Sequence, residues 1–282
     1  MAASRTAQYV ALYRALESVG PRARLRDPWA ARFLTPSLAG AVRAARLAPV
    51  GALLAGYADL RAPGARTSAI ARTLYIDELV RRATAAGTRQ LVILGAGYDC
   101  RAHRLPELAG TTVYEVDRAE TQAHKRALLG DGARTDVRYV PVDFLRDDVA
   151  ARLAAAGWEA TRPSLFIWEG VTNYLSEPAV RAVLAWIGRA AAGSRVVFTY
   201  VHAGLLDGSV AFADGERAIG RVRALGEPWT FGLRPDEVAP FVAGCGLGLV
   251  EDSGADDYRR RWLGRTARGY AFYRIAVADV AG

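Results

Sequence analysis

The chain has 282 residues and a formal net charge of +8, and its composition, 51% apolar and 23% charged, is ordinary for a globular protein. It contains neither a low-complexity tract nor an internal repeat, which argues against disordered and repeat architectures. The basic residues are arginines scattered along the sequence, with Lys125 as the single lysine, whereas nucleic-acid-binding proteins cluster their basic residues. We therefore expect no nucleic-acid partner, although the positive field would attract an anionic acceptor.

Cys100 and Cys245 lie far apart in the sequence, whereas disulfide frameworks and zinc sites need several ligands at short spacings. We expect no metal site, and the cysteine content fits a reducing cytoplasm. The apolar segment 38–60 is interrupted by two arginines and Pro49, and the first apolar stretch also carries arginines. Neither a membrane span nor a signal peptide is therefore expected.

Residues 1–89 have helical periodicity and contain no segment with the composition of a strand. We expect residues 1–89 to form a helical cap packed on a core of residues 90–282. The acceptor would bind beneath this cap.

From residue 90 onward, short runs of Val, Ile and Leu alternate with helical segments, which is typical of βαβ units around a parallel sheet. The predicted strands are 90–94, 112–115, 137–142, 165–168, 196–200, 247–251 and 270–277. The predicted helices are 119–129, 147–156, 177–192 and 235–245, the third beginning after Ser176 with Pro178 in its first turn. The expected fold is α/β and Rossmann-like, a seven-stranded, mostly parallel sheet with helices on both faces. Segment 204–234, which contains Trp229, is either a mobile lid over the strand ends or a plain connecting helix with loops.

The first predicted strand runs into Gly95, Ala96 and Gly97, and glycines there let the backbone approach a ligand closely. In open α/β sheets, ligands bind outside the carboxyl ends of the strands. Asp117 follows Gly95 by 22 residues, where an acidic side chain can accept hydrogen bonds from both hydroxyls of a ribose. Cys100 replaces the third glycine of the dinucleotide fingerprint, which disfavours a pyrophosphate.

Two further carboxylates end predicted strands. Asp143 precedes Phe144, and this pair suits an adenine, because the carboxylate accepts from the exocyclic amino group while the ring packs near the base. Alternatively, Asp143 caps the following helix. Glu169 ends the fourth strand. Together, these carboxylates suit S-adenosylmethionine, a cationic, hydroxyl-rich ligand that needs no phosphate site.

Several motifs are shared with a known family. They are Asp27-Pro28-Trp29-Ala30, Ala71-Arg72-Thr73 with Asp77, residues 94–101, 114–117 and 142–144, and Glu169-Gly170 followed by Tyr174-Leu175. The chain thereby resembles the leucine carboxyl methyltransferase-like family, and more closely its bacterial S-adenosylmethionine-dependent and polyketide O-methyltransferases. The resemblance implies that Arg72 pairs with the cofactor's carboxylate, Gly95 lies against its methionine portion and Glu169 lies near its amino end. It also implies that Asp117 takes the ribose and that Asp143 with Phe144 holds the adenine.

Methyl transfer from a sulfonium is an in-line displacement that depends on positioning and on exclusion of water. A carboxylate acceptor is already ionised, whereas a phenol benefits from a base. His202, just after the fifth predicted strand, is the candidate base, and the alternative is an ordinary loop histidine. Tyr174 either contacts the acceptor or packs beneath the cofactor. We expect His103 and His124 to be surface residues.

We therefore predict an S-adenosylmethionine-dependent O-methyltransferase that acts on a carboxylate or phenolic oxygen of a small molecule of the polyketide type. Two alternatives stay open. One is a protein of the same fold that uses the cofactor for a non-methylating reaction such as cyclisation or decarboxylation. The other is a nicotinamide-dependent oxidoreductase, which Cys100 and the carboxylates of Asp143 and Glu169 disfavour.

Overall fold

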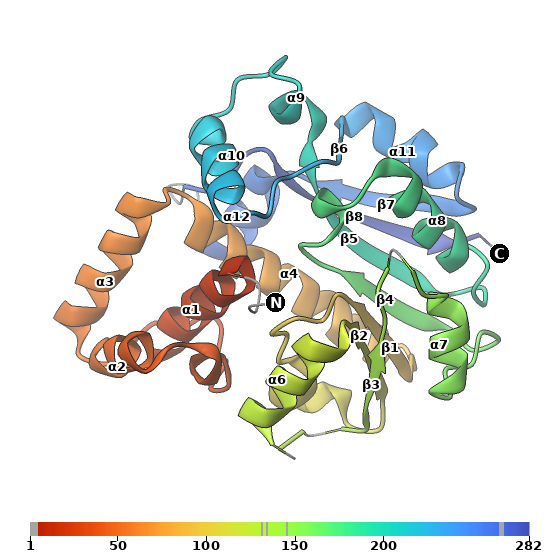
Figure 1. The fold of residues 1–282 in the computed structure, drawn as a ribbon, viewed down its shortest axis with the longest axis horizontal. Coiled ribbons are helices and arrows are strands. Elements are labelled where there is room, and N and C mark those ends of the chain that lie inside the picture. The colour runs from red at the N-terminus through yellow and green to blue at the C-terminus, as the bar shows by residue number, and fades with distance from the viewer. Residues whose placement is uncertain (1–4, 131, 134, 145, 265–267, 282) are drawn as a thin grey trace.

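The centre of the protein is a mixed β-sheet with the strand order β3-β2-β1-β4-β5-β8-β7, and β6 pairs with β5 (Figure 1). The computed structural model describes residues 5–130, 132–133, 135–144, 146–264 and 268–281. Its strands are β1 (Gln90–Leu94), β2 (Thr112–Asp117), β3 (Val137–Pro141), β4 (Ser164–Trp168), β5 (Arg195–His202), β6 (Gly232–Leu233), β7 (Leu247–Ser253) and β8 (Tyr273–Val280). Neighbouring strands are parallel, except that β8 runs antiparallel to β5 and β7.

The topology places a crevice at β1. Strand β1 pairs with β2 on one side and with β4 on the other. The later strands are therefore added on both sides of β1. At such a switch point, the loops that leave the neighbouring strands separate and open a crevice at their carboxyl ends. The fold therefore directs the ends of β1, β2, β3 and β4 toward a common site.

The sheet is buried on both faces, as strands of a parallel sheet usually are. All five residues of β1 are buried. Because successive side chains alternate, Val92 and Leu94 join one hydrophobic cluster, while Leu91 and Ile93 join the other. Helices supply the opposing surfaces (Figure 1).

The helices are α1 (Arg5–Val19), α2 (Pro36–Ala44), α3 (Ala48–Arg61), α4 (Ala65–Ala85), α5 (Arg101–Arg104), α6 (Ala119–Leu129), α7 (Val149–Ala155), α8 (Glu177–Ile187), α9 (Ala203–Leu206), α10 (Gly215–Ala224), α11 (Pro235–Ala243) and α12 (Ala255–Leu263). Three 3₁₀ turns span Ala30–Phe33, Pro106–Leu108 and Thr172–Tyr174. Helix α8 shows how sequence periodicity becomes packing. Its Val180, Val183, Leu184 and Ile187 repeat at helical spacing and are buried in the first cluster. None of the described helices is long and apolar enough to cross a membrane.

The N-terminal region divides into two parts. Helices α1, α2 and α3 extend away from the sheet (Figure 1). Helix α4, which also lies within 1–89, instead packs Ile76, Leu79 and Val80 into the cluster on the second face of the sheet. The helical cap over the strand ends is therefore formed by α1 to α3, and α4 belongs to the layers of the core.

The predicted α/β, Rossmann-like fold is confirmed, with one added strand and with strand bounds that differ from the predicted ones by up to three residues. The sheet has eight strands because Gly232 and Leu233 add β6, and β8 begins at Tyr273 instead of residue 270. Helix α8 ends at Ile187 and not at residue 192. At Gly188 the chain approaches another backbone so closely that a Cβ would lie 2.1 Å from the carbonyl oxygen of Cys245. Segment 204–234 contains α10 and β6, so a helix with loops is present there.

Candidate cofactor and acceptor site

A cavity of about 970 Å³ opens at the carboxyl ends of the central strands and continues beneath the helical cap. The residues predicted to bind the cofactor all line it. They are Arg72, Gly95, Ala96, Gly97, Asp117, Asp143, Phe144 and Glu169. Tyr174 lines it as well, but His202 does not. Within the described residues there is no group of His, Cys, Asp or Glu side chains that could hold a metal ion.

The loop after β1 has a backbone that requires glycine. Gly95 has φ +69° and Gly97 has φ +44°, which is the left-handed region that residues with a Cβ avoid. A Cβ at Gly95 would lie 2.4 Å from Cγ2 of Val171. The loop is also tied to the next strand, since the amides of Gly95 and Ala96 donate to the carbonyl oxygen of Val116 at 2.8 and 3.0 Å. The tight turn leaves the backbone facing the cavity without side chains in the way.

Asp117 is held by the same loop. One oxygen of its carboxylate accepts the amide of Gly97 at 2.6 Å, and the other accepts the amide of Arg118 at 2.7 Å. A carboxylate offers about four lone-pair positions, so two backbone donors orient this group and leave positions for ribose hydroxyls. The geometry fits the ribose role that the sequence indicated.

Asp143 lies at the end of β3 beside Phe144, and both line the cavity. The amide of Asp143 donates to Oδ2 of Asp147 at 2.8 Å, and the Asp143 carboxylate lies 3.8 Å from Nε of the exposed Arg146. The alternative role of Asp143 as a helix cap is wrong, because Asp148 caps α7 by accepting the amide of Ala151 at 3.1 Å. Asp143 therefore does not cap α7, and it lies at the rim of the cavity.

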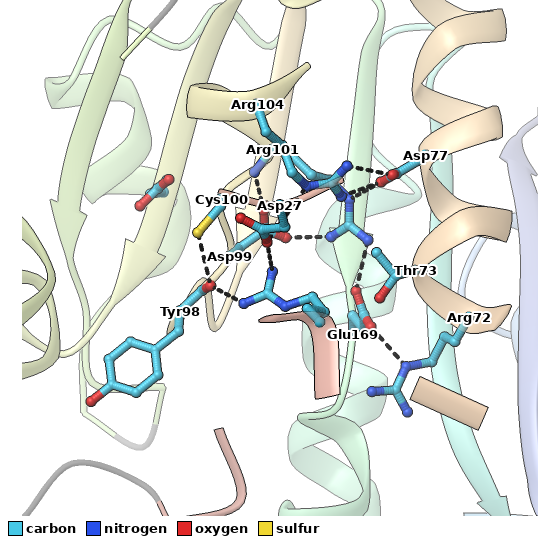
Figure 2. Close-up of polar contacts among 12 residues, drawn as sticks. Asp27, Arg72, Thr73, Asp77, Tyr98, Asp99, Cys100, Arg101, Arg104 and Glu169 are labelled. Atoms are coloured by element: carbon cyan, nitrogen blue, oxygen red, sulfur yellow. Dashed lines mark hydrogen bonds and ion pairs between the residues drawn. The ribbon is translucent and has the colours of Figure 1, made fainter. Parts of the chain in front are cut away.

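Glu169 and Arg72 form the opposite wall. Nε of Arg72 lies 2.7 Å from Oε1 of Glu169, and Nη2 of Arg101 lies 3.0 Å from Oε2 (Figure 2). The Arg72 guanidinium also stacks over the ring of Tyr273, 4.8 Å from its centroid. Burial raises the pKa of Glu169, but the guanidinium groups of Arg101 and Arg72 outweigh it and hold that pKa below its ordinary value. Glu169 is therefore ionised at neutral pH.

Arg72 is oriented with part of its guanidinium still available. Its side chain is buried except toward the cavity, with 8% of the residue exposed. In the described part of the chain, its only hydrogen bond is the one from Nε to Glu169. The two terminal nitrogens are thus free to bind a carboxylate in a forked arrangement. The donor set fits the amino-acid end of the cofactor.

Behind this wall lies a buried network of charges that sequence reasoning did not assemble (Figure 2). Arg101 binds Asp99, and it binds Asp77 at 2.9 Å. Arg104 also contacts Asp77, at 2.5 Å. The neighbouring cationic groups lower the pKa of Asp77 despite burial, which favours its uncharged form. The network holds Asp99 and Glu169 at the edge of the cavity.

The network also reaches the cap. Arg14 of α1 lies 3.1 Å from Asp27 and donates to the carbonyl oxygen of Tyr98 at 2.5 Å. Asp27 in turn accepts the amides of Trp29 and Ala30. The family motifs include Asp27, but no local signal pointed to Arg14, whose partners are distant in sequence. Cap and cofactor loop are therefore connected by a buried hydrogen bond from Arg14 to Tyr98.

The wall of the cavity beneath the cap comes from α1, α3 and α10 and from the segments around Trp229 and Tyr270. Its aromatic members are Tyr9, Tyr13, Tyr57, Tyr174, Trp229 and Tyr270, and aliphatic side chains such as Leu54, Val222 and Leu225 lie between them. The sequence had pointed only to Tyr174 and, through the possible lid 204–234, to Trp229. They share no motif and are brought together only by the fold.

The two candidate catalytic residues differ in position. Tyr174 ends a 3₁₀ turn at the cavity, and burial raises the pKa of its hydroxyl. His202 lies outside the cavity, where its Nδ1 accepts the amide of Gly204 at 3.0 Å and its ring packs on Phe212. Burial, with help from Arg234 and Arg274, lowers the pKa of His202. The structure therefore supports the alternative of an ordinary loop histidine.

The other two histidines also lie away from the cavity. His124 is exposed, as expected. The expectation for His103 was wrong, because it is fully buried beside Trp29, with the ring centroids 5.3 Å apart. Helix α5 has only four residues and packs inward, so His103 follows Cys100 and Ala102 into the interior.

The strand order, the glycine turn and the carboxylates at the strand ends define a class I S-adenosylmethionine-dependent methyltransferase. The model of the leucine carboxyl methyltransferase family matches residues 7–188. The chain belongs to this family, and the oxidoreductase alternative is thereby set aside.

Individual relatives agree with this assignment. A "putative S-adenosyl-L-methionine-dependent methyltransferase" of Frankia alni is 39% identical over 206 residues, which cover 72% of this chain and 70% of that protein. A relative of the same description from Streptomyces coelicolor is 36% identical over 247 residues, covering 86% and 81%. Among solved structures, a DUF574 family protein from Streptomyces avermitilis has a TM-score of 0.59 at 17% identity and covers 95% of this chain and 97% of its own. A "putative methyltransferase" from Thermobifida fusca has a TM-score of 0.59 at 20% identity, with coverages of 97% and 94%. These two structures share the fold.

Proposed function

We propose that this methyltransferase transfers the methyl group to an oxygen of a small aromatic molecule of the polyketide type, and that a carboxylate is the preferred acceptor. The observation that carries the proposal is the cavity of about 970 Å³, which runs from the strand ends to an aromatic wall beneath the cap. Cavities of about 300–1,000 Å³ suit small molecules and cofactors. This one has room for a compact acceptor beside the cofactor.

In this proposal the cofactor is held by groups already oriented by the protein. Asp117 takes the ribose hydroxyls, Asp143 and Phe144 take the adenine, Arg72 takes the carboxylate and Glu169 takes the amino group. When bound, S-adenosylmethionine supplies an electrophilic methyl group on a sulfonium sulfur. The protein contributes binding, alignment and exclusion of water, which account for most of the acceleration of such a displacement.

The preference for a carboxylate follows from the proton-accepting groups at the cavity. Among the described residues that line it there is no histidine. The raised pKa of Tyr174 keeps its hydroxyl protonated at neutral pH, so this group donates a hydrogen bond to the acceptor and does not remove a proton from it. Glu169 is engaged by two guanidinium groups. An acceptor oxygen that is already ionised needs no base.

The test is a product assay. The purified protein is incubated with S-adenosylmethionine that carries a deuterated methyl group and with a panel of bicyclic aromatic carboxylic acids and the matching phenols. Mass spectrometry then follows S-adenosylhomocysteine and the labelled product. We expect labelled methyl esters formed with an equal amount of S-adenosylhomocysteine.

Two other product patterns would contradict the proposal. Labelled ethers from the phenols alone would overturn the carboxylate preference. An altered product without S-adenosylhomocysteine would replace methyl transfer with the non-methylating alternative.

A further inference from the structure

The wall beneath the cap contains a cation that the proposed cofactor site does not use. Six arginines line the cavity: Arg14, Arg61, Arg72, Arg101, Arg118 and Arg221. Arg14, Arg72 and Arg101 are each paired with a buried or nearly buried carboxylate. Within the described part of the chain, Arg61, Arg118 and Arg221 take part in no ion pair. Arg61 and Arg118 are exposed, so among the described arginines that line the cavity Arg221 is the partly buried one without a carboxylate partner.

Arg221 is held in place by neutral groups. It lies in the last turn of α10, and its Nη2 donates to the carbonyl oxygen of Arg61 at the end of α3. Its charge also opposes the rise in pKa that burial causes at Tyr270 and Tyr13, which line the cavity with it. The guanidinium therefore lies between α3 and two tyrosines, with donors to spare.

The carboxylates of the cavity are already engaged. Asp99 and Glu169 bind Arg101, Asp117 accepts two backbone amides, and Asp143 lies near Arg146. Glu227, the acidic residue on the same wall as Arg221, accepts the hydroxyl of Thr6. None of these groups neutralises Arg221.

We propose that Arg221 binds an ionised group of the acceptor, distinct from the oxygen that receives the methyl group. This inference rests on the proposed function and narrows its substrate class to planar aromatic acids that carry a second polar function. The aromatic side chains around Arg221 would contact the ring system, while the guanidinium takes the charge. The methyl-accepting oxygen must lie elsewhere, because a guanidinium bound to it would withdraw electron density from the attacking lone pair.

The strongest competing role for Arg221 is purely structural, as a tether that holds the end of α3 to α10. The two roles differ in one measurable respect. A tether supports charged and uncharged acceptors equally, whereas an anion site distinguishes them. The test therefore compares two probes of the same shape, naphthalene-2,6-dicarboxylate and its monoamide, 6-carbamoyl-2-naphthoate.

Binding of each probe is measured by calorimetric titration of the full chain saturated with S-adenosylhomocysteine, so that Arg72 is already occupied. The wild type should bind the dicarboxylate about 10-fold or more tighter than the monoamide, as expected for hydrogen bonds to a charged group. Arg221→Gln should abolish this preference, and Arg221→Lys should restore part of it. Arg223→Gln is the matched control, because Arg223 lies on the same helix but is exposed and outside the cavity. That variant should keep the wild-type preference.

Unchanged affinity of each variant for S-adenosylhomocysteine shows that the fold is intact. Equal loss of affinity for both probes in Arg221→Gln would overturn the inference in favour of the tether. Persistence of the preference in that variant, or failure of the wild type to bind either probe, would also overturn it. Binding through Arg221 without methylation of any panel member would instead contradict the proposed function and leave this inference standing.

Discussion

Replacement of Asp117 by alanine tests the cofactor site at its most constrained point. The carboxylate is fixed by amides at 2.6 and 2.7 Å, and in our account it also accepts both ribose hydroxyls. A hydrogen bond to a charged group contributes about 1.5–3 kcal/mol, and the lower value suits a half-buried site. Loss of two such bonds amounts to about 3 kcal/mol, or roughly a 100-fold weaker Kd.

The measurement is calorimetric titration of S-adenosylhomocysteine into wild type, Asp117→Ala and Asp117→Asn. The asparagine variant keeps an acceptor but loses the charge, so its affinity should lie between the other two, since charge-assisted bonds are about twice as strong as neutral ones. Asp136→Ala, a change at an exposed carboxylate that pairs with Arg138, is the control and should bind like the wild type. Unaltered affinity in a folded Asp117→Ala variant would refute the assignment of the ribose to this residue.

Three further outcomes follow. Gly95→Ala should lower the free energy of unfolding by about 1–3 kcal/mol, the usual range for overpacking, because its Cβ would meet Val171 at 2.4 Å; urea unfolding measures this, and a neutral result would contradict the close packing. His202→Ala should leave the rate of carboxylate methylation nearly unchanged, and a loss of ~10²–10⁴, typical of a general base, would restore His202 to the mechanism. Burial lowers the pKa of His103 from 6.5 to about 4, so the unfolded state takes up a proton first and stability should fall as the pH drops from 6.5 toward 4. His103→Gln should weaken this dependence of stability on pH. An equal effect of His124→Gln would count against the assignment of the pH dependence to His103.

The parts of the fold that were predicted are those with a strong local pattern. The ends of β1 and α6 coincide with the predicted ranges 90–94 and 119–129, because the apolar run after Gln90 and a glycine-terminated helix mark their own boundaries. Strand β6 has two residues and is defined only by its pairing with β5. No periodicity exists over two residues, so the sequence could not reveal it.

Helix α12 was missed for a different reason. Its sequence carries five charged residues among nine, ADDYRRRWL, and this composition hides a narrow buried stripe. Ala255 and Tyr258 are buried, and both belong to the cluster that α4 covers. The helix depends on a partner distant in sequence, so tertiary packing decides its conformation.

In the candidate site, too, some residues are predictable from the local pattern and others are brought together only by the fold. The grouping of the strand-end carboxylates at one cavity was predictable because parallel strands bring their carboxyl ends to one edge of a sheet. The contacts between Arg101, Asp77 and Arg104 were not, since each residue chooses its partner only in the folded structure. The aromatic wall was also beyond prediction, because α1, α3 and α10 are far apart in the chain. The acceptor side of an enzyme of this kind is therefore the side that a single sequence describes least.

The central claim is that this chain holds S-adenosylmethionine through carboxylates at the strand ends and places its methyl group beneath the cap. A crystal structure with bound S-adenosylhomocysteine tests it most directly. We predict ribose hydroxyls on Asp117, the adenine beside Asp143 and Phe144, and the cofactor carboxylate on Arg72, with its sulfur facing the wall that carries Arg221. S-Adenosylhomocysteine bound elsewhere, or bound with Asp117 and Arg72 out of contact, would contradict the account.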